Sequence, residues 1–137
     1  MRTLHVGLRV SDLQRSLVFY KAVGYAVIGT VEGTPHGTLC MLQLPDDPFV
    51  TLELVHNPAH GNDGHGTGIS HLVIQAGSLD AALADLAANG ITAEPPGLPG
   101  GPDGARTSWI TDPDGYRIEL VQWPAGHADG ITKADFR

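Results

Sequence analysis

The chain has 137 residues, of which 42% are hydrophobic and 17% charged, and this ordinary globular composition predicts one folded domain and excludes wholesale disorder. Its net charge is −7 at pH 7 and its basic residues are scattered, which argues against a nucleic-acid partner. No apolar run approaches the roughly 18 residues that span a bilayer, and Cys40 is the only cysteine. We therefore expect a cytoplasmic protein with no membrane partner.

The first half of the chain predicts four strands and one helix. Residues 4–10 alternate apolar side chains with others, as a half-buried strand does, and Ser11 with Gln14 has the spacing of a capping box. The helix that follows ends at Gly24, a residue suited to a left-handed stop. Short apolar runs predict three further strands, at residues 25–31, 37–44 and 49–57.

The second half repeats this order after a linker at residues 58–68, which is rich in glycine and polar side chains. A strand is expected at 71–75, and a helix capped by Ser78 and ended by Gly90. The remaining strands are predicted at residues 91–93, 105–110 and 116–123, with a tight turn at 112–115. Residues 124–137 predict a polar, loosely held tail.

The two halves align without a gap at an offset of 66 residues, the separation of His5 from His71. At this offset Glu53 meets Glu119, so each half has a histidine at its first strand and a glutamate at its last. The prediction is a single α+β domain over residues 1–123, built from paired βαβββ modules at 1–57 and 69–123.

The repeated histidines and glutamates predict a metal site. Each glutamate stands between apolar neighbours in a strand, so its carboxylate points to the opposite face, where an unpaired buried carboxylate would be costly. Two imidazoles and two carboxylates brought together by the repeat would hold a divalent ion such as nickel, cobalt, iron, manganese or zinc. Open positions on an octahedral ion would permit catalysis.

Two polar residues share a strand face with these candidate ligands, Arg9 with His5 and Asn57 with Glu53. We predict that both meet an anionic substrate. Cys40 is expected in the core. The other histidines are expected at the surface, namely His36, His56, His60, His65 and His127.

Four stretches together resemble the glyoxalase, bleomycin-resistance and ring-cleaving dioxygenase superfamily, also called vicinal oxygen chelate proteins. They are LHVGLRVSDLQRSLVFY at residues 4–20, LELVHN at 52–57, ISHLVIQ at 69–75 and DPDGYRIELV at 112–121. Within that superfamily the chain most resembles the short bacterial glyoxalase I group, the lactoylglutathione lyases.

The resemblance implies a glyoxalase-like fold and a homodimer. Each metal would be held by His5 and Glu53 of one subunit and by His71 and Glu119 of the other. Nickel is the implied metal, with cobalt or zinc as alternatives.

The implied reaction isomerises the hemithioacetal of methylglyoxal and a thiol, glutathione in the family, to a lactoyl thioester. It proceeds by proton transfer through a metal-bound enediolate. By position, Glu119 would be the main base and Glu53 would lie on the opposite side of the metal. Arg9 and Asn57 match positions that hold the glutathione moiety. The chain departs from the lyases at residues 97–106, which contain Arg106 but no lysine. It also departs at residues 31–37, a shorter loop that contains His36 and would reshape the mouth of the pocket.

Other members of the superfamily remain alternatives. A ring-cleaving dioxygenase or thiol transferase would use three ligands, so Glu53 as a fourth argues against both. An acyl-CoA epimerase would carry an amide at that position. A metal-free, small-molecule-binding resistance protein would not need the four ligands, and another thiol cofactor also stays open.

Overall fold

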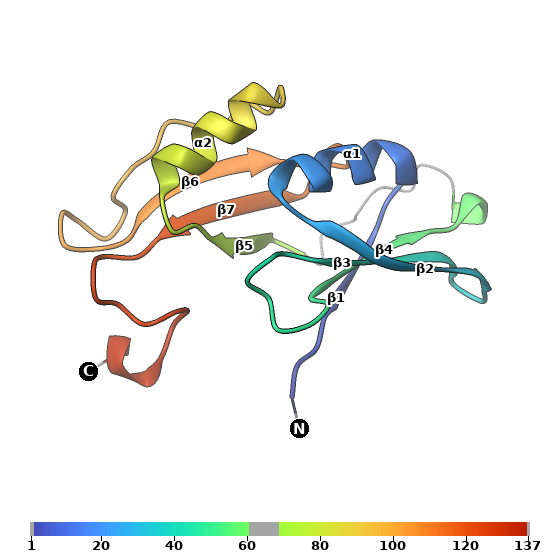
Figure 1. The fold of residues 1–137 in the computed structure, drawn as a ribbon, viewed down its shortest axis with the longest axis horizontal. Coiled ribbons are helices and arrows are strands. Elements are labelled where there is room, and N and C mark those ends of the chain that lie inside the picture. The colour runs from blue at the N-terminus through green and yellow to red at the C-terminus, as the bar shows by residue number, and fades with distance from the viewer. Residues whose placement is uncertain (1, 61–68, 137) are drawn as a thin grey trace. The chain divides into compact units, whose positions relative to one another are not determined.

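The computed structural model describes residues 2–60 and 69–136. The chain divides into two compact units (Figure 1). Unit 1 comprises Met1–Ile69 with the turn Asp112–Gly115, and unit 2 comprises Ser70–Thr111 and Tyr116–Arg137. Most of the expected linker lies outside the described residues, apart from a short 3₁₀ helix η1 at Pro58–His60.

Within the described ranges, no helix is both long and apolar enough to cross a membrane.

Unit 1 contains a four-stranded sheet in the order β1-β4-β3-β2. The strands are β1 at Val6–Arg9, β2 at Ala26–Thr34, β3 at Gly37–Gln43 and β4 at Leu52–His56. β1 runs parallel to β4, whereas β3 is antiparallel to both of its neighbours. Each of the four strands predicted for this half is therefore present, with shifted ends.

Helix α1 of unit 1 spans Leu13–Val23 and is capped by Asp12, whose carboxylate accepts a hydrogen bond from the Arg15 N–H at 3.0 Å. The expected cap at Ser11 is wrong, because the Ser11 hydroxyl donates to Asp114 instead, at 2.6 Å. The predicted stop at Gly24 is confirmed by its φ of 127°, a conformation that favours glycine.

The two faces of the unit 1 sheet differ because successive side chains of a strand alternate. One face packs with α1 and forms the core, which contains Leu8, Cys40, Leu42, Leu52 and Leu54 beside Phe19 and Tyr20. The burial predicted for Cys40 is confirmed. Leu4 and Val6 were expected on the same buried face but are 56% and 46% exposed, since β1 begins only at Val6 and lies at the edge of the sheet.

Unit 2 has a three-stranded sheet in the order β5-β7-β6, with β7 parallel to β5 and antiparallel to β6. Helix α2 packs against β6 and β7 (Figure 1) and is capped by Ser78, as predicted. The elements are β5 at His71–Gln75, α2 at Leu79–Ala88, β6 at Arg106–Thr111, β7 at Arg117–Gln122 and a short 3₁₀ helix η2 at Lys133–Phe136.

The strand predicted at residues 91–93 is wrong. The Ile91 N–H instead donates to the Leu86 carbonyl of α2 at 2.9 Å, and the contact with β6 is limited to a hydrogen bond from the Glu94 N–H to the Trp109 carbonyl at 2.9 Å and an isolated bridge between Gly97 and Thr107. Pro95 and Pro96 follow after Glu94, and proline has no N–H to donate to a strand ladder. In the described part of the chain, the sheet of unit 2 therefore has three strands and that of unit 1 has four.

Residues 124–136 make specific contacts with the rest of unit 2, in contrast to the loosely held tail expected from their composition. His127 stacks on Trp123 with ring centroids 4.4 Å apart, and its Nε2 lies 2.6 Å from an Asp135 carboxylate oxygen. The Gln75 amide donates to Asp129 at 2.7 Å. The Ala128 carbonyl, and then Asp135, raise the pKa of His127 above its usual value.

Candidate functional site

Each unit carries one of the predicted histidine–glutamate pairs on the face of its sheet that the helix does not cover. In unit 1 the His5 Nε2 lies 3.2 Å from the Glu53 Oε2. In unit 2 the His71 Nε2 lies 3.8 Å from the Glu119 Oε2. The strand register repeats as well, with Gly7 opposite Glu53 and Val73 opposite Glu119. The sequence repeat therefore corresponds to the same local arrangement of histidine, glutamate and paired strands in each unit.

The unit 1 pair has a spacing that suits two ligands of one metal ion. Nitrogen and oxygen ligands bind at about 2.1 Å, so two of them at right angles lie about 3 Å apart. The Glu53 side chain is 14% exposed and the His5 side chain 33%, so both are accessible from solvent. Among residues 2–60 and 69–136, however, no group of three or more metal-ligating side chains lies close enough to hold an ion.

The His71 ring is held from two sides. Its Nδ1 lies 2.9 Å from the Ser70 hydroxyl, which leaves Nε2 facing Glu119. The Trp109 ring approaches the imidazole edge to face at 5.2 Å. The Arg117 guanidinium lies over the Trp109 ring, 5.0 Å from its centroid, and pairs with Glu94 at 2.8 Å. This hydrogen bond from Arg117 lowers the pKa of Glu94.

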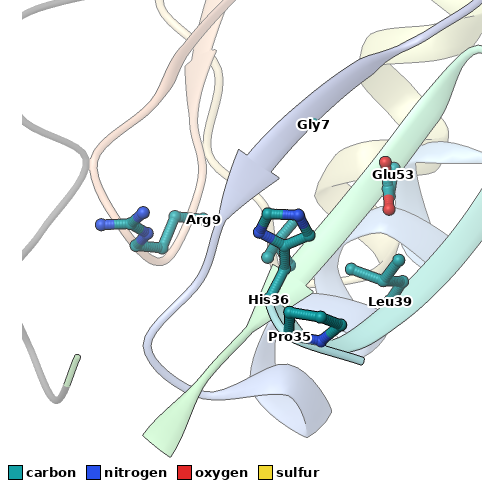
Figure 2. A pocket seen from close by; sticks show the side chains of 7 residues that line it. Gly7, Arg9, Pro35, His36, Leu39 and Glu53 are labelled. Atoms are coloured by element: carbon teal, nitrogen blue, oxygen red, sulfur yellow. The ribbon is translucent and has the colours of Figure 1, made fainter. Parts of the chain in front are cut away.

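A pocket of about 330 Å³ opens on the same face of the unit 1 sheet as Glu53 (Figure 2). Figure 2 shows His36 rising from the turn between β2 and β3, with Arg9 on one side of it and Glu53 on the other in this view. The lining residues are Gly7, Arg9, Pro35, His36, Leu39, Glu53 and Val55.

Arg9 and Asn57, the two predicted substrate contacts, have different surroundings. Arg9 lines the pocket together with Glu53. Asn57 is not among the lining residues, and its side-chain oxygen accepts a hydrogen bond from the Ala59 N–H at 3.1 Å. That bond braces the start of η1.

His36 was expected at the surface, in a shortened loop that would reshape the mouth of the pocket. It is exposed, as expected, and it lines the pocket. The position depends on the sheet order, which brings the β2–β3 turn beside β4, and no local pattern in the sequence carries that information. The side chains of His60 and His65 are outside the described part of the chain, and His56 has the strand parity of the core-facing Leu54.

Arg106, the basic residue of the stretch at 97–106, lies on the opposite face of the unit 2 sheet from Glu119. It is paired in register with Gln122, whose side chain accepts from the Leu79 N–H at the start of α2. The Arg106 guanidinium lies 2.8 Å from Asp80 of that helix. This arginine therefore belongs to the helix-covered side of the unit 2 sheet.

The family model of the Glyoxalase/Bleomycin resistance protein/Dioxygenase superfamily matches residues 2–120. The chain belongs to this superfamily, and the predicted fold class is confirmed by its structural neighbours.

Curated relatives match over nearly the whole chain. The chain is 33% identical over 132 residues to a probable lactoylglutathione lyase from Vibrio cholerae, covering 93% of this chain and 94% of that one. It is 33% identical over 127 residues to a lactoylglutathione lyase from Haemophilus influenzae, covering 89% and 93%. Among solved structures, a trypanothione-dependent glyoxalase I from Leishmania major aligns with a TM-score of 0.70 at 28% identity, covering 89% of this chain and 86% of that one.

Proposed function

We propose that the protein is a metal-dependent lactoylglutathione lyase, which isomerises the hemithioacetal of methylglyoxal and a thiol to a lactoyl thioester. One observation carries the proposal. A histidine and a glutamate face each other at equal chain separation on the open side of each sheet, in a chain similar to enzymes named for this reaction. A paired imidazole and carboxylate supply both metal ligands and a proton acceptor.

The four side chains His5, Glu53, His71 and Glu119 serve one divalent ion in this proposal, with nickel first and cobalt or zinc as alternatives. The donor set of two imidazoles and two carboxylates suits such ions. When bound, the ion would polarise the substrate oxygens and stabilise the negative charge that develops on them. A homodimer, in which the two pairs of one site come from different subunits, and a cytoplasmic location belong to the same proposal.

The proton transfer falls to the two glutamates. Glu119 removes the proton from the carbon that bears the sulfur, and the adjacent carbonyl carbon receives a proton in return, so the reaction needs no oxidant or reductant. The Glu119 side chain is 23% exposed, which leaves it accessible to a substrate. Glu53 would lie on the opposite side of the metal.

Arg9 and Asn57 would hold the thiol part of the substrate. Arg9 lines the same pocket as Glu53, and this position supports the role, because a guanidinium binds carboxylates through paired hydrogen bonds. For Asn57, the support is its place directly after β4, two residues beyond Val55 of the pocket wall.

The test is metal-dependent turnover. The protein is stripped with a chelator, given nickel, cobalt, zinc or manganese singly, and assayed for thioester formation from methylglyoxal and glutathione. We expect nickel or cobalt to restore activity. Absence of thioester with every metal, although an ion is bound, would refute the lyase function.

A substitution identifies the base in the same assay. We expect Glu119→Gln to lower kcat by at least about 100-fold, the usual contribution of a general base, while circular dichroism shows an unchanged fold. Glu32→Gln is the matched control, because Glu32 is an exposed residue of β2 outside the pocket lining. Full activity in Glu119→Gln would remove this residue from the mechanism.

A further inference from the structure

The turn that carries His36 is held in place by short-range contacts. Pro35 and His36 form the two-residue connection between β2 and β3. The Thr34 hydroxyl donates to the Gly37 carbonyl at 2.6 Å and accepts from the His36 N–H at 3.1 Å. Pro35 also fixes its own φ. The His36 side chain therefore projects from a braced backbone.

The tip of this hairpin abuts the end of β4. Gly37 has a φ of 98°, and a Cβ built on it would overlap the carbonyl oxygen of His56 and approach Asn57. The contact fixes the turn against the strand that carries Glu53, which explains why His36 and Glu53 line one pocket. A residue placed by such packing is suited to fixed recognition of a ligand.

The polar lining of this pocket consists of Arg9, His36 and Glu53, and its apolar wall includes Leu39 and Val55. The His36 ring makes no hydrogen bond or ion pair with any described residue. The hydrogen bond to Thr34 comes from the backbone N–H of His36 and not from its ring. It therefore presents an unengaged hydrogen-bond donor at the pocket.

The stretch at 97–106 does not provide a comparable donor. Its one basic side chain, Arg106, is engaged by Asp80 on the helix-covered side of its sheet. Within the described residues of unit 1, Arg9 and His36 are the pocket groups that can donate hydrogen bonds from a side chain to an anion.

We propose that His36 binds a carboxylate of the thiol part of the substrate and so determines which thiol the enzyme accepts, an inference that rests on the proposed function. The pocket would then select a low-molecular-weight thiol that carries a carboxylate. The carboxylate end of this thiol would lie at Arg9 and His36, and its reacting end would point toward Glu53. An uncharged thiol gains nothing from His36.

The test compares two hemithioacetals of methylglyoxal, one made with glutathione and one with the uncharged thiol N-acetylcysteamine. We expect His36→Ala to raise KM for the glutathione adduct about tenfold, as for a lost hydrogen bond to a charged group, with kcat within twofold. KM for the uncharged adduct stays unchanged. His36→Asn, which keeps a donor, recovers part of the loss, and calorimetric binding of S-methylglutathione weakens in parallel with KM.

His56→Ala is the matched control, because His56 is a histidine of the same unit that does not line the pocket. An unchanged KM for the glutathione adduct in His36→Ala, or an equal loss for both adducts, overturns the inference while the lyase function stands. If the unmodified protein forms no thioester from either adduct, the proposed function fails and the inference fails with it.

Discussion

Two carboxylates of the turn at residues 112–115 show how single side chains fix a helix in unit 1. Asp112 is 4% exposed and accepts a hydrogen bond from the Tyr20 hydroxyl at 2.7 Å. Asp114 accepts from the Ser11 N–H at 3.0 Å and from the hydroxyl of Ser16 at 3.2 Å. A buried carboxylate is costly unless such donors compensate for its lost hydration. The sequence predicts the turn, but not which helix its carboxylates meet.

Removing the phenolic hydroxyl of Tyr20 tests how much this hydrogen bond stabilises the fold. Tyr20→Phe keeps the ring and deletes one donor to the buried Asp112, so we expect the free energy of unfolding in urea to fall by about 1–3 kcal/mol. A double-mutant cycle with Asp112→Asn should give a coupling energy of about 1 kcal/mol. Strict additivity of the two substitutions would contradict a direct interaction.

His127 and Asp135 make the packing of the C-terminal segment dependent on pH. Because the pKa of His127 is raised, the stability that this residue adds to the packing of the segment is fully present below pH 6.5, its usual pKa. That stability is lost as the pH rises through the raised pKa. The pKa of Asp135 is lowered by the hydrogen bond from the Thr132 N–H and then by His127. The stability that Asp135 adds is therefore present above pH 3.8, its usual pKa, and is lost as the pH falls through the lowered pKa. The segment is therefore held most firmly in mildly acidic solution.

Trypsin cleavage after Lys133 measures this effect, because Lys133 begins η2. We expect the unmodified protein to be cut more slowly than His127→Gln at pH 6, and the two rates to converge toward pH 9. Taking the ratio of the two rates at each pH removes the pH dependence of trypsin itself. A ratio that does not change with pH would show that His127 does not hold the segment through its charge.

At the scale of elements, the stability of the β2–β3 hairpin depends more on Gly37 than on Gly33. Gly37 and Gly33 both have positive φ, 98° and 69°, but a Cβ at Gly37 would overlap the His56 carbonyl whereas one at Gly33 meets nothing within 4 Å. We expect Gly33→Ala to cost about 1 kcal/mol of unfolding free energy, the usual penalty for a positive φ. Gly37→Ala should cost about 2–4 kcal/mol because overpacking adds to that penalty.

The same pair of variants links the hairpin to the site. Displacement of the tip moves His36, so Gly37→Ala should also raise KM for the glutathione adduct, whereas Gly33→Ala should not. Urea denaturation and steady-state kinetics on both variants provide the two readouts. Equal losses of stability would show that the hairpin tip is not packed against β4.

Local patterns in the sequence predicted the elements whose apolar residues repeat with a clear period, and they failed at residues 91–93. Alternation located β1 and β5, and the cap at Ser78 located α2. The strand expected at 91–93 failed because the two prolines that follow it remove backbone donors. The histidine–glutamate pairs could be found because a repeat conserves the spacing of both residues within the chain. For His36 only the resemblance pointed to the pocket mouth, because its place beside β4 follows from the order of the strands.

At the scale of the whole molecule, each unit holds half of the proposed ligand set, so metal binding should tie the stability of the protein to both pairs. A ligand that binds only the folded state at 100 times its Kd adds about 2.7 kcal/mol to the unfolding free energy. We therefore expect chelation to lower the Tm, and nickel to restore it.

Metal content distinguishes one shared ion from an ion at each pair. If His5, Glu53, His71 and Glu119 serve one ion, the protein binds one per chain, and either His5→Ala or His71→Ala abolishes both binding and the nickel-dependent rise in Tm. His56→Ala, which changes a histidine away from both pairs, should retain the ion and the rise. If each pair instead bound an ion of its own, each substitution would leave half of the metal in place, and elemental analysis of the purified variants would detect it.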